Sequence, residues 1–337
     1  MEGRPAPAAG EAGLSEFLIA TRKSKMALAQ THHVADLLRD AVPGIEVGIA
    51  ENRPRGDRDQ VSRLDRHGGK GGAFVAEIRA DVVAGRTQAA MHSLKDMPGN
   101  EETPELVIGA FLTRDDPTDS LVLRPGLTMA ELGADGGRGY RMGTNSVRRA
   151  AFLRELFPHV EVIHFRGAAD SRIAKLDAGE GQKMVDGSVT EPADAILLAT
   201  SGMARVGVSD RIGHTFSTTE MLPAVGQGIV AVECAADDWE TREKLARIDD
   251  AAARACASCE REVLWVLDGH CNSPIAAHAV LDGKTMRLEA AVMSLDGATI
   301  LRERAEGEAA YPRELGRRVA LALVAQGAQK LIEDTRV

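Results

Sequence analysis

Short apolar segments alternate with helical patterns along most of the chain, and this alternation constrains the fold more than any other feature. The apolar segments have the length of buried strands, and in the helical patterns apolar residues recur every three or four positions. Such alternation predicts an α/β architecture with largely parallel sheets, in which ligands bind beyond the carboxyl ends of the strands. The expected strands are 17–20, 160–165, 195–200 and 229–234, and the clearest helices are 26–38 and 147–157.

The length and composition indicate a multi-domain globular protein. A chain of 337 residues is too long for one ordinary core. It is 44% hydrophobic and 27% charged, without an apolar run long enough to cross a bilayer, so no membrane segment is expected. Residues 1–14 lack the cationic and apolar regions of a secretion signal, and we interpret them as a disordered tail.

Charge and cysteine content narrow the class of protein further. A net charge of -9 disfavours a nucleic-acid surface, which usually carries a basic excess. The cysteines are Cys234, Cys256, Cys259 and Cys271, too sparse for a disulfide scaffold, so a cytoplasmic location is expected.

Two polar or glycine-rich segments are predicted to be crossovers between domains. Residues 113–119 (TRDDPTD) separate two apolar runs, and residues 222–228 (LPAVGQG) precede another. In the second segment Gly226 and Gly228 give the backbone freedom to hinge. Beyond residue 250 the pattern predicts a smaller α+β domain with hairpin-like strands. Residues 179–192 are rich in glycine and charge and are predicted to be an exposed loop.

Cations gather where two helices are expected to begin. Arg22 and Lys25 lie at the start of the first helix, and Arg148 with Arg149 follow Ser146 at the start of another. The free N–H groups of a helix start already carry partial positive charge, so cations there are unfavourable unless an anion binds among them. Guanidinium groups and helix-start amides together suit a carboxylate or phosphate. Alternatively, these side chains are simply solvated or paired with acidic residues.

Three further arginines follow predicted strands. Arg166 ends one strand, Arg172 follows six residues later, and Arg205 lies just beyond another strand, so all three are expected at one sheet edge. A ligand with several carboxylates explains this set. Phosphate is the alternative, but the segment 68–72 (GGKGG) lacks the hydroxyl residue of a phosphate-binding loop.

Two sites could carry covalent or electrostatic chemistry. Lys95 and Asp96 lie at a turn before Pro98, where an ionised carboxylate could stabilise a cation that develops on a substrate. The alternative is an ordinary surface pair. Cys271 lies in a short polar loop where an exposed thiol could act as a nucleophile.

The alternatives for Cys271 are an inert cysteine or a zinc ligand. A zinc site would use Cys256, Cys259, His270 and Cys271. It is disfavoured because the first two cysteines lie on a helical pattern and no second pair closes the set.

The order of the motifs resembles that of the hydroxymethylbilane synthases, also called porphobilinogen deaminases. The resemblance covers nearly all of residues 17–280. It implies two periplasmic-binding-protein-like (type II) domains and a smaller C-terminal α+β domain. The motifs are IATRKSKMALAQ (19–30), GGKGGAFVAEI (68–78), HSLKDMP (92–98), GTNSVRRAAFLRELFP (143–158), HFRGAADSRIAKL (164–176), ADAILLATSGMARVG (193–207), LPAVGQGIVAVEC (222–234) and LDGHCNSPIAAHA (267–279).

The resemblance also implies domain bounds, a reaction and a cofactor. Domain 1 would span 15–113 with 229–247, domain 2 would span 116–222, and domain 3 would span 250–337. The enzyme would be a transferase that condenses four porphobilinogen molecules head to tail with release of ammonia, and then hydrolyses off linear hydroxymethylbilane for tetrapyrrole and haem biosynthesis. Its cofactor is a dipyrromethane attached through a cysteine thioether, which matches Cys271.

Individual roles follow from the same motif matches. Asp96 would be catalytic, stabilising the azafulvene-like cation that forms when ammonia leaves. No metal, membrane or nucleic-acid partner is expected for this chain, and a monomer is expected. The cofactor would be bound by Lys95, Ser146, Arg148, Arg149 and Arg172, and the substrate by Arg22, Ser24, Lys70, Arg166 and Arg205.

A two-domain cleft also serves proteins that only bind anions, so a non-enzymatic anion-binding protein is the main alternative. Asp96 and Cys271 distinguish the two hypotheses. Capture of an anion needs neither a carboxylate that stabilises a cation nor a thiol that tethers a cofactor.

Overall fold

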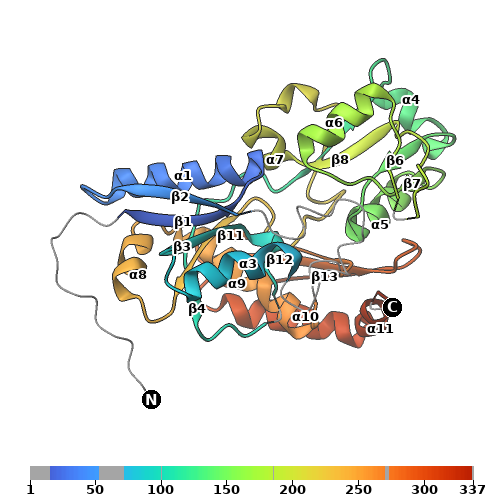
Figure 1. Cartoon of the computed structure of the whole chain (residues 1–337). Coiled ribbons are helices and arrows are strands. Elements are labelled where there is room, and N and C mark those ends of the chain that lie inside the picture. The colour runs from blue at the N-terminus through green and yellow to red at the C-terminus, as the bar shows by residue number, and fades with distance from the viewer. Residues whose placement is uncertain (1–15, 53–71, 100, 185, 270–272, 336–337) are drawn as a thin grey trace.

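The computed structural model describes residues 16–52, 72–99, 101–184, 186–269 and 273–335. The expected tail at 1–14 lies outside these residues. The described chain forms two five-stranded sheets and one three-stranded sheet. In Figure 1 the first sheet lies to the left, the second at the upper right, and the third with its helices below them.

The first sheet has the order β2-β1-β3-β10-β4 and carries helices on both faces. Only β10 runs antiparallel to its neighbours β3 and β4, while β2, β1 and β3 are mutually parallel. Its elements are β1 (Phe17–Arg22), α1 (Lys25–Ala41), β2 (Val47–Asn52), α3 (Gly72–Val83), β3 (Ala89–Ser93), the short 3-10 helix η2 (Leu94–Asp96), β4 (Leu106–Phe111), β10 (Val230–Ala235) and α8 (Trp239–Ala246).

The second sheet has the matching order β7-β6-β8-β5-β9, and only β5 runs against its neighbours. Helix α5 packs on one face and α6 on the other. Its elements are β5 (Asp119–Leu123), α4 (Met129–Gly133), η3 (Ala134–Gly137), β6 (Arg141–Gly143), α5 (Val147–Leu156), β7 (Glu161–Ile163), α6 (Ala169–Ala178), β8 (Ala195–Ala199), α7 (Thr200–Arg205), η4 (Ser209–Arg211) and β9 (His214–Phe216).

The two antiparallel strands mark the passages between the sheets. After β4 the chain leaves the first sheet and enters the second as β5, and after β9 it returns to the first sheet as β10. These passages contain the two segments expected to be crossovers. Gly226 and Gly228 have φ values of 74° and 90°, a left-handed conformation that glycine adopts without strain.

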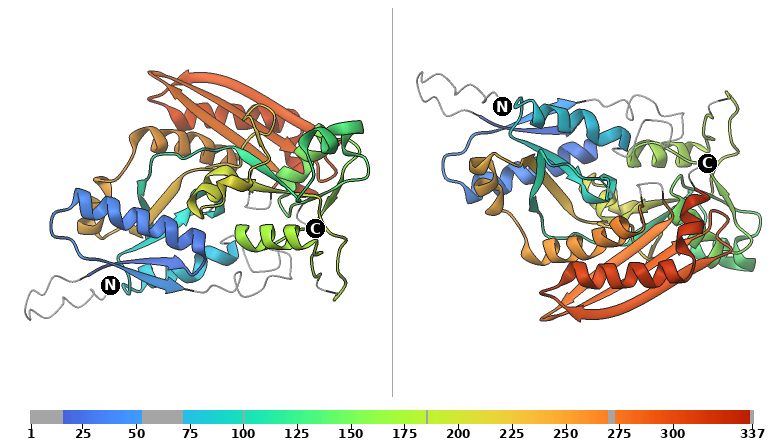
Figure 2. Two further views of the ribbon diagram at one scale, coloured as in Figure 1. Left: turned by 90° about the horizontal axis from the view of Figure 1, so that it is seen from above. Right: turned by 90° about the horizontal axis from the view of Figure 1, so that it is seen from below.

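The C-terminal part is smaller and packs against both larger parts (Figure 2). Its antiparallel sheet β11-β12-β13 covers a core shared with α9 and α10. Ala276 and Met293 of this sheet also join the core beneath α5, whereas Ala253 and Ala257 of α9 pack on the first sheet. The elements are α9 (Ala251–Val266), β11 (Ile275–Asp282), β12 (Thr285–Met293), β13 (Ile300–Glu308), α10 (Pro312–Ala325) and α11 (Ala328–Glu333).

The architecture confirms the predicted class of two α/β parts, here with sheets of matching strand order, and a smaller C-terminal α+β part. The expectation of an exposed loop at 179–192 is confirmed only in part, because most of its described residues are exposed but one is buried. The segment 179–192 is not simply an exposed loop, because Lys183 pairs with Val189 in an antiparallel bridge and Gln182 is buried.

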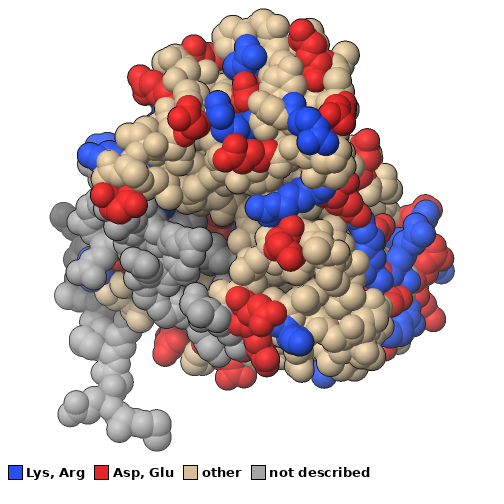
Figure 3. Space-filling model, turned by 90° about the vertical axis from the view of Figure 1, so that its right-hand side faces the viewer, with Lys and Arg blue, Asp and Glu red and all other residues tan. Residues whose placement is uncertain are grey.

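The positive and negative side chains on the face shown in Figure 3 are interspersed, without one large patch of either sign. No helix in the described part of the chain is long and apolar enough to span a membrane.

Candidate active site

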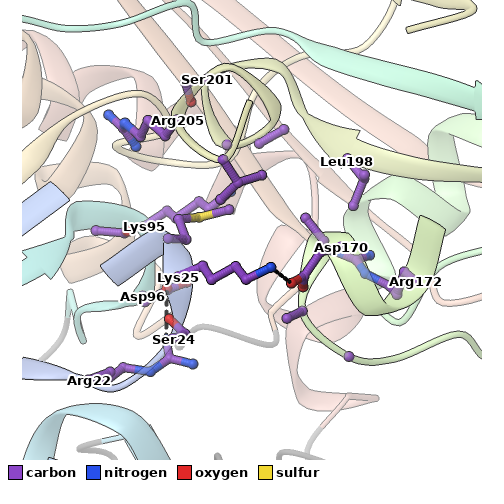
Figure 4. A pocket seen from close by; sticks show the side chains of 18 of the residues that line it. Arg22, Ser24, Lys25, Lys95, Asp96, Asp170, Arg172, Leu198, Ser201 and Arg205 are labelled. Atoms are coloured by element: carbon purple, nitrogen blue, oxygen red, sulfur yellow. Dashed lines mark ion pairs between the residues drawn. The ribbon is translucent and has the colours of Figure 1, made fainter. Parts of the chain in front are cut away.

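One pocket lies between the first two sheets and gathers most of the predicted site residues (Figure 4). Ser146 and Arg148 do not line it, and Lys70 and Cys271 lie outside the described residues. The predicted residues that line the pocket are Arg22, Ser24, Lys95, Asp96, Arg149, Arg166, Arg172 and Arg205.

The first wall of the pocket comes from the end of β1 and the start of α1. Ser24 is the N-cap of α1, where its Oγ accepts a hydrogen bond of 3.2 Å from the Ala27 N–H. This cap ends the strand and turns the preceding Arg22 toward Asp96, whose carboxylate Oδ2 lies 3.9 Å from the Arg22 Nη1. The Asp96 side chain remains 42% exposed, so a ligand in the pocket can reach it.

Lys95 lies beside Asp96 at the end of β3, and its surroundings disfavour its charge. Its ammonium donates to the Gln227 Oε1 at 3.1 Å. Desolvation, together with the nearby Arg149, lowers the pKa of Lys95 to about 8. An anion in the pocket would therefore stabilise the charged form of Lys95.

Asp119 at the start of β5 binds both arginines of the α5 start. Its Oδ2 lies 2.7 Å from Arg148 Nη2, and its Oδ1 lies 2.7 Å from Arg149 Nη2. All three side chains are buried. Burial alone would raise the pKa of Asp119, but the two arginines outweigh it and hold this pKa far below its usual range.

Arg148 and Arg149 are successive residues of α5, so helical geometry alone predicts that their side chains diverge by about 100° and reach different carboxylates, which the structure does not show. The two guanidinium groups converge on opposite oxygens of the same Asp119 carboxylate. Arg148 also donates to the Leu222 carbonyl at 2.8 Å, which keeps it behind the pocket, whereas Arg149 reaches the pocket. Ser146 is the N-cap of α5 and accepts from the Arg149 N–H at 3.4 Å.

Gln227, in the second crossover, forms hydrogen bonds with both Lys95 and Asp119. Its Nε2 donates to Asp119 Oδ1 at 3.0 Å and to the Pro117 carbonyl at 2.7 Å, while its Oε1 accepts from Lys95. The side chain is fully buried. Sequence reasoning missed both Asp119 and Gln227. In the sequence each of the two is only a polar residue beside an apolar strand. That pattern does not reveal that Asp119 and Gln227, which are 108 positions apart, form a hydrogen bond.

The second wall carries Arg166, which follows β7, and Arg172 of α6, which reaches β8. Arg172 donates to the Leu197 carbonyl at 3.2 Å, but its Nε is buried and has no hydrogen-bond partner among the described residues. Desolvation, with Arg149 nearby, lowers the pKa of Arg172 to about 9. Since no described carboxylate pairs with it, an acidic ligand in the pocket would relieve this cost.

Two ion pairs join the walls. Arg205 of α7 binds Asp115 in the first crossover and also donates to the Gly228 carbonyl at 3.1 Å. Lys25 at the start of α1 lies 3.2 Å from Asp170 in the first turn of α6, and Figure 4 shows this pair spanning the pocket. Asp170 was not predicted for the site, whereas Lys25 was expected only as one of the cations at the start of the first helix.

The cysteines in the described regions are packing residues. Cys234, Cys256 and Cys259 are all buried, and burial raises the pKa of Cys259 to about 12. A buried thiol with such a pKa is a poor nucleophile. Within the described ranges no group of three or more His, Cys, Asp or Glu side chains is arranged to hold a metal ion.

Comparison with known proteins gives a consistent picture. The family described as "Porphobilinogen deaminase, dipyromethane cofactor binding domain" matches residues 17–243, and "Porphobilinogen deaminase, C-terminal domain" matches residues 254–325. A protein named porphobilinogen deaminase 2 from Streptomyces coelicolor (strain ATCC BAA-471 / A3(2) / M145) is 40% identical over 317 residues, covering 94% of this chain and 96% of that protein.

A second relative, named porphobilinogen deaminase, comes from Stenotrophomonas maltophilia (strain K279a). It is 40% identical over 316 residues, which cover 93% of this chain and 98% of the relative. Among solved structures, the methionine binding protein MetQ is similar with a TM-score of 0.40 and 10% identity, covering 69% of this chain and 89% of MetQ.

Proposed function

The chain belongs to the porphobilinogen deaminase family and is a hydroxymethylbilane synthase of tetrapyrrole biosynthesis, and from this premise we propose how its pocket works. The acetate and propionate groups of porphobilinogen and of the growing chain bind the cations of the pocket. Asp96 acts on the reacting pyrrole. The observation that carries this proposal is Arg172, whose buried Nε has no hydrogen-bond partner in the described part of the chain.

Carboxylate binding is divided between the two walls. Arg149, Arg166, Arg172 and Arg205 offer guanidinium forks from the part of the chain that forms the second sheet, and Arg22 and Lys95 add positive charge from the first. A guanidinium fork matches the two oxygens of a carboxylate. Arg148 and Ser146 do not contact the ligand but support Arg149. Arg148 shares the Asp119 carboxylate with Arg149, and Ser146 caps the helix that carries both arginines. Ser24 caps α1 in the same way. For Lys70, a role in substrate binding is proposed from the motif match alone.

The reaction needs stabilisation of a positive charge. When the bond between the aminomethyl carbon and its protonated nitrogen breaks, ammonia leaves with the electron pair of that bond and the pyrrole becomes cationic. The Asp96 carboxylate lies in the pocket and is exposed enough to face this cation. A carboxylate among arginines weakens simple anion binding, so its presence favours catalysis over an anion-binding protein.

The residues also fit the dipyrromethane group that the family implies. This cofactor carries the same acidic side chains as the substrate, and the unsatisfied Arg172 Nε suits an additional acid. We propose that Cys271 attaches it through a thioether. When bound, the dipyrromethane supplies the pyrrole end on which the product chain is built. Arg149, Arg172 and Lys95 would hold its carboxylates.

We further propose three domains, which span 15–113 with 229–247, 116–222 and 250–337. Their bounds follow the passages between the sheets and the start of the α9 helix. We place the enzyme in the cytoplasm as a monomer.

Incubation of the purified protein with porphobilinogen tests the proposed function. Four molecules of ammonia should appear for each molecule of linear hydroxymethylbilane. Binding of porphobilinogen without release of ammonia would favour the anion-binding alternative and contradict the proposal.

A further inference from the structure

The segment between α6 and β8 closes into a small hairpin against the active-site side of the second sheet. Helix α6 ends at Gly179, whose φ of 63° is left-handed. Beyond it, the Gln182 N–H donates to Thr190 Oγ1 at 2.9 Å, and the Thr190 N–H donates to the Gln182 carbonyl at 2.9 Å. A Cβ on Gly181 would lie 1.8 Å from the Thr190 carbonyl oxygen, so this approach requires glycine.

The hairpin directs one buried side chain toward Arg166. Gln182 is only 3% exposed, although most of the hairpin is exposed. Its Oε1 accepts a hydrogen bond of 3.1 Å from the backbone N–H of Arg166 and one of 3.2 Å from Lys175 Nζ. Lys175 also lies 3.4 Å from the Arg166 carbonyl oxygen. The Gln182 amide oxygen therefore fixes the backbone of Arg166 from behind.

The turn that carries Arg166 has no side-chain cap of its own. Ala168 is the N-cap of α6 and provides no side-chain hydrogen bond, and the intervening Gly167 has a φ of 131°. A turn of this kind gains little local restraint from its own residues. Arg166 itself lines the pocket and is buried.

We propose that Gln182 is a positioning residue of the active site, which holds the Arg166 backbone so that its guanidinium meets a substrate carboxylate. This inference rests on the proposed function, because the role of Arg166 in carboxylate binding is itself proposed. The 179–192 segment would then contribute to substrate binding through Gln182.

Two substitutions of similar size separate positioning from packing. Gln182→Met keeps the volume but removes the acceptor, whereas Gln182→Glu keeps an acceptor oxygen for both the Arg166 N–H and Lys175. Ser188→Ala, in the exposed part of the same hairpin, is the control. Its hydroxyl bonds only Asp186 among the described residues.

The readouts are hydrogen exchange at the Arg166 amide and the steady-state constants for porphobilinogen in the holoenzyme. In Gln182→Met the amide should exchange faster, and KM should rise about tenfold with kcat within about twofold, since a lost hydrogen bond to a buried group shifts an equilibrium by roughly that factor. Gln182→Glu should restore KM, and Ser188→Ala should match the wild type.

Unchanged exchange and KM in Gln182→Met would overturn the inference. So would a fall in kcat and thermal stability that Gln182→Glu does not restore, because that pattern reports structural support only. If Arg166→Met leaves KM unchanged, the role of Arg166 and this inference both fail. Faster exchange in Gln182→Met would then show that Gln182 does hold the Arg166 backbone, and that only the proposed role of Arg166 in carboxylate binding is wrong.

Discussion

Asp96 is the acidic side chain of the pocket that lies next to both a β-strand end and two cations. Arg22 approaches it from β1, and Lys95 precedes it in the chain. We expect Asp96→Asn to keep the fold and the cofactor, because amide and carboxylate have nearly the same shape. Loss of the charge should lower kcat on the order of a hundredfold or more.

Turnover of porphobilinogen measures this effect, and the intact mass of the denatured variant checks that the cofactor is present. An Asn variant with near wild-type kcat would show that Asp96 is not the catalytic carboxylate.

Lys95 makes stability depend on pH. Desolvation and Arg149 lower its pKa from 10.5 to about 8 in the folded protein. Between these values the unfolded chain binds more protons at this site than the folded protein, so the free energy of unfolding should rise with pH across this window. Below about pH 8 the side chain is charged in both states and the penalty is constant.

Lys95→Met removes this titration. In the Cys271→Ser background, where no cofactor carboxylate pairs with Lys95, the unfolding free energy of the protein that keeps Lys95 minus that of the Lys95→Met variant, measured with urea at a series of pH values, should therefore increase from about pH 8 to about pH 10.5. A difference that stays flat over this range would contradict the lowered pKa.

At the scale of elements, the start of α5 combines a cap, two arginines and the buried Asp119. Arg149→Leu leaves this carboxylate with fewer donors and removes a guanidinium from the pocket. Breaking such a buried pair typically costs about 3–5 kcal/mol of stability. We expect a large loss of cofactor assembly or elongation in this variant.

Lys23→Leu is the matched control at the start of α1. Lys23 is mostly exposed and lies 3.5 Å from Glu51, and exposed pairs of this kind are worth about 0–1 kcal/mol. Intact mass reports the cofactor, and single-turnover assays report elongation. Equal, small effects of the two variants on cofactor content and elongation would mean that Arg149 does not bind the cofactor or the growing chain.

The elements themselves were largely predictable from the sequence. The predicted strand 17–20 is the core of β1, and the predicted helix 147–157 is α5 within one residue. Local patterns suffice there, because periodicity and capping residues lie within a few positions of one another. The pattern also placed most of the cations at the pocket.

Contacts between distant segments were not predictable in this way. The Asp119 pairing with two arginines and Gln227, and the contact of Gln182 with the Arg166 backbone, each depend on how the sheets and loops pack. The exposed-loop prediction for 179–192 holds for most of the segment but missed the buried Gln182 for the same reason, since the glycines and charges of the segment do not reveal that one amide is buried.

At the scale of the whole molecule, Glu260 of α9 joins the three parts of the chain. Its carboxylate accepts two hydrogen bonds from Arg114 in the first crossover, at 2.6 and 2.9 Å. It also accepts from the Gly226 N–H at 2.7 Å in the second crossover and from the Ala279 N–H at 2.8 Å in β11. Both crossovers and the C-terminal part therefore depend on one buried acid.

Glu260→Gln should destabilise the protein by about 3–5 kcal/mol, because Arg114 keeps its charge in a buried site. Glu240→Gln, which changes an exposed pair with Lys244, should cost no more than about 1 kcal/mol. Urea unfolding monitored by circular dichroism measures both values. Similar midpoints for the two variants would contradict a joining role for Glu260.

We propose that this enzyme builds its product on a dipyrromethane attached to Cys271. The mass of the purified protein, measured intact after denaturation, tests this most directly because a thioether survives unfolding. The wild type should exceed its sequence mass by two linked pyrrole units, and Cys271→Ser should lack this increment. An active wild-type enzyme without added mass, or an adduct mapped to Cys234, Cys256 or Cys259, would contradict the account.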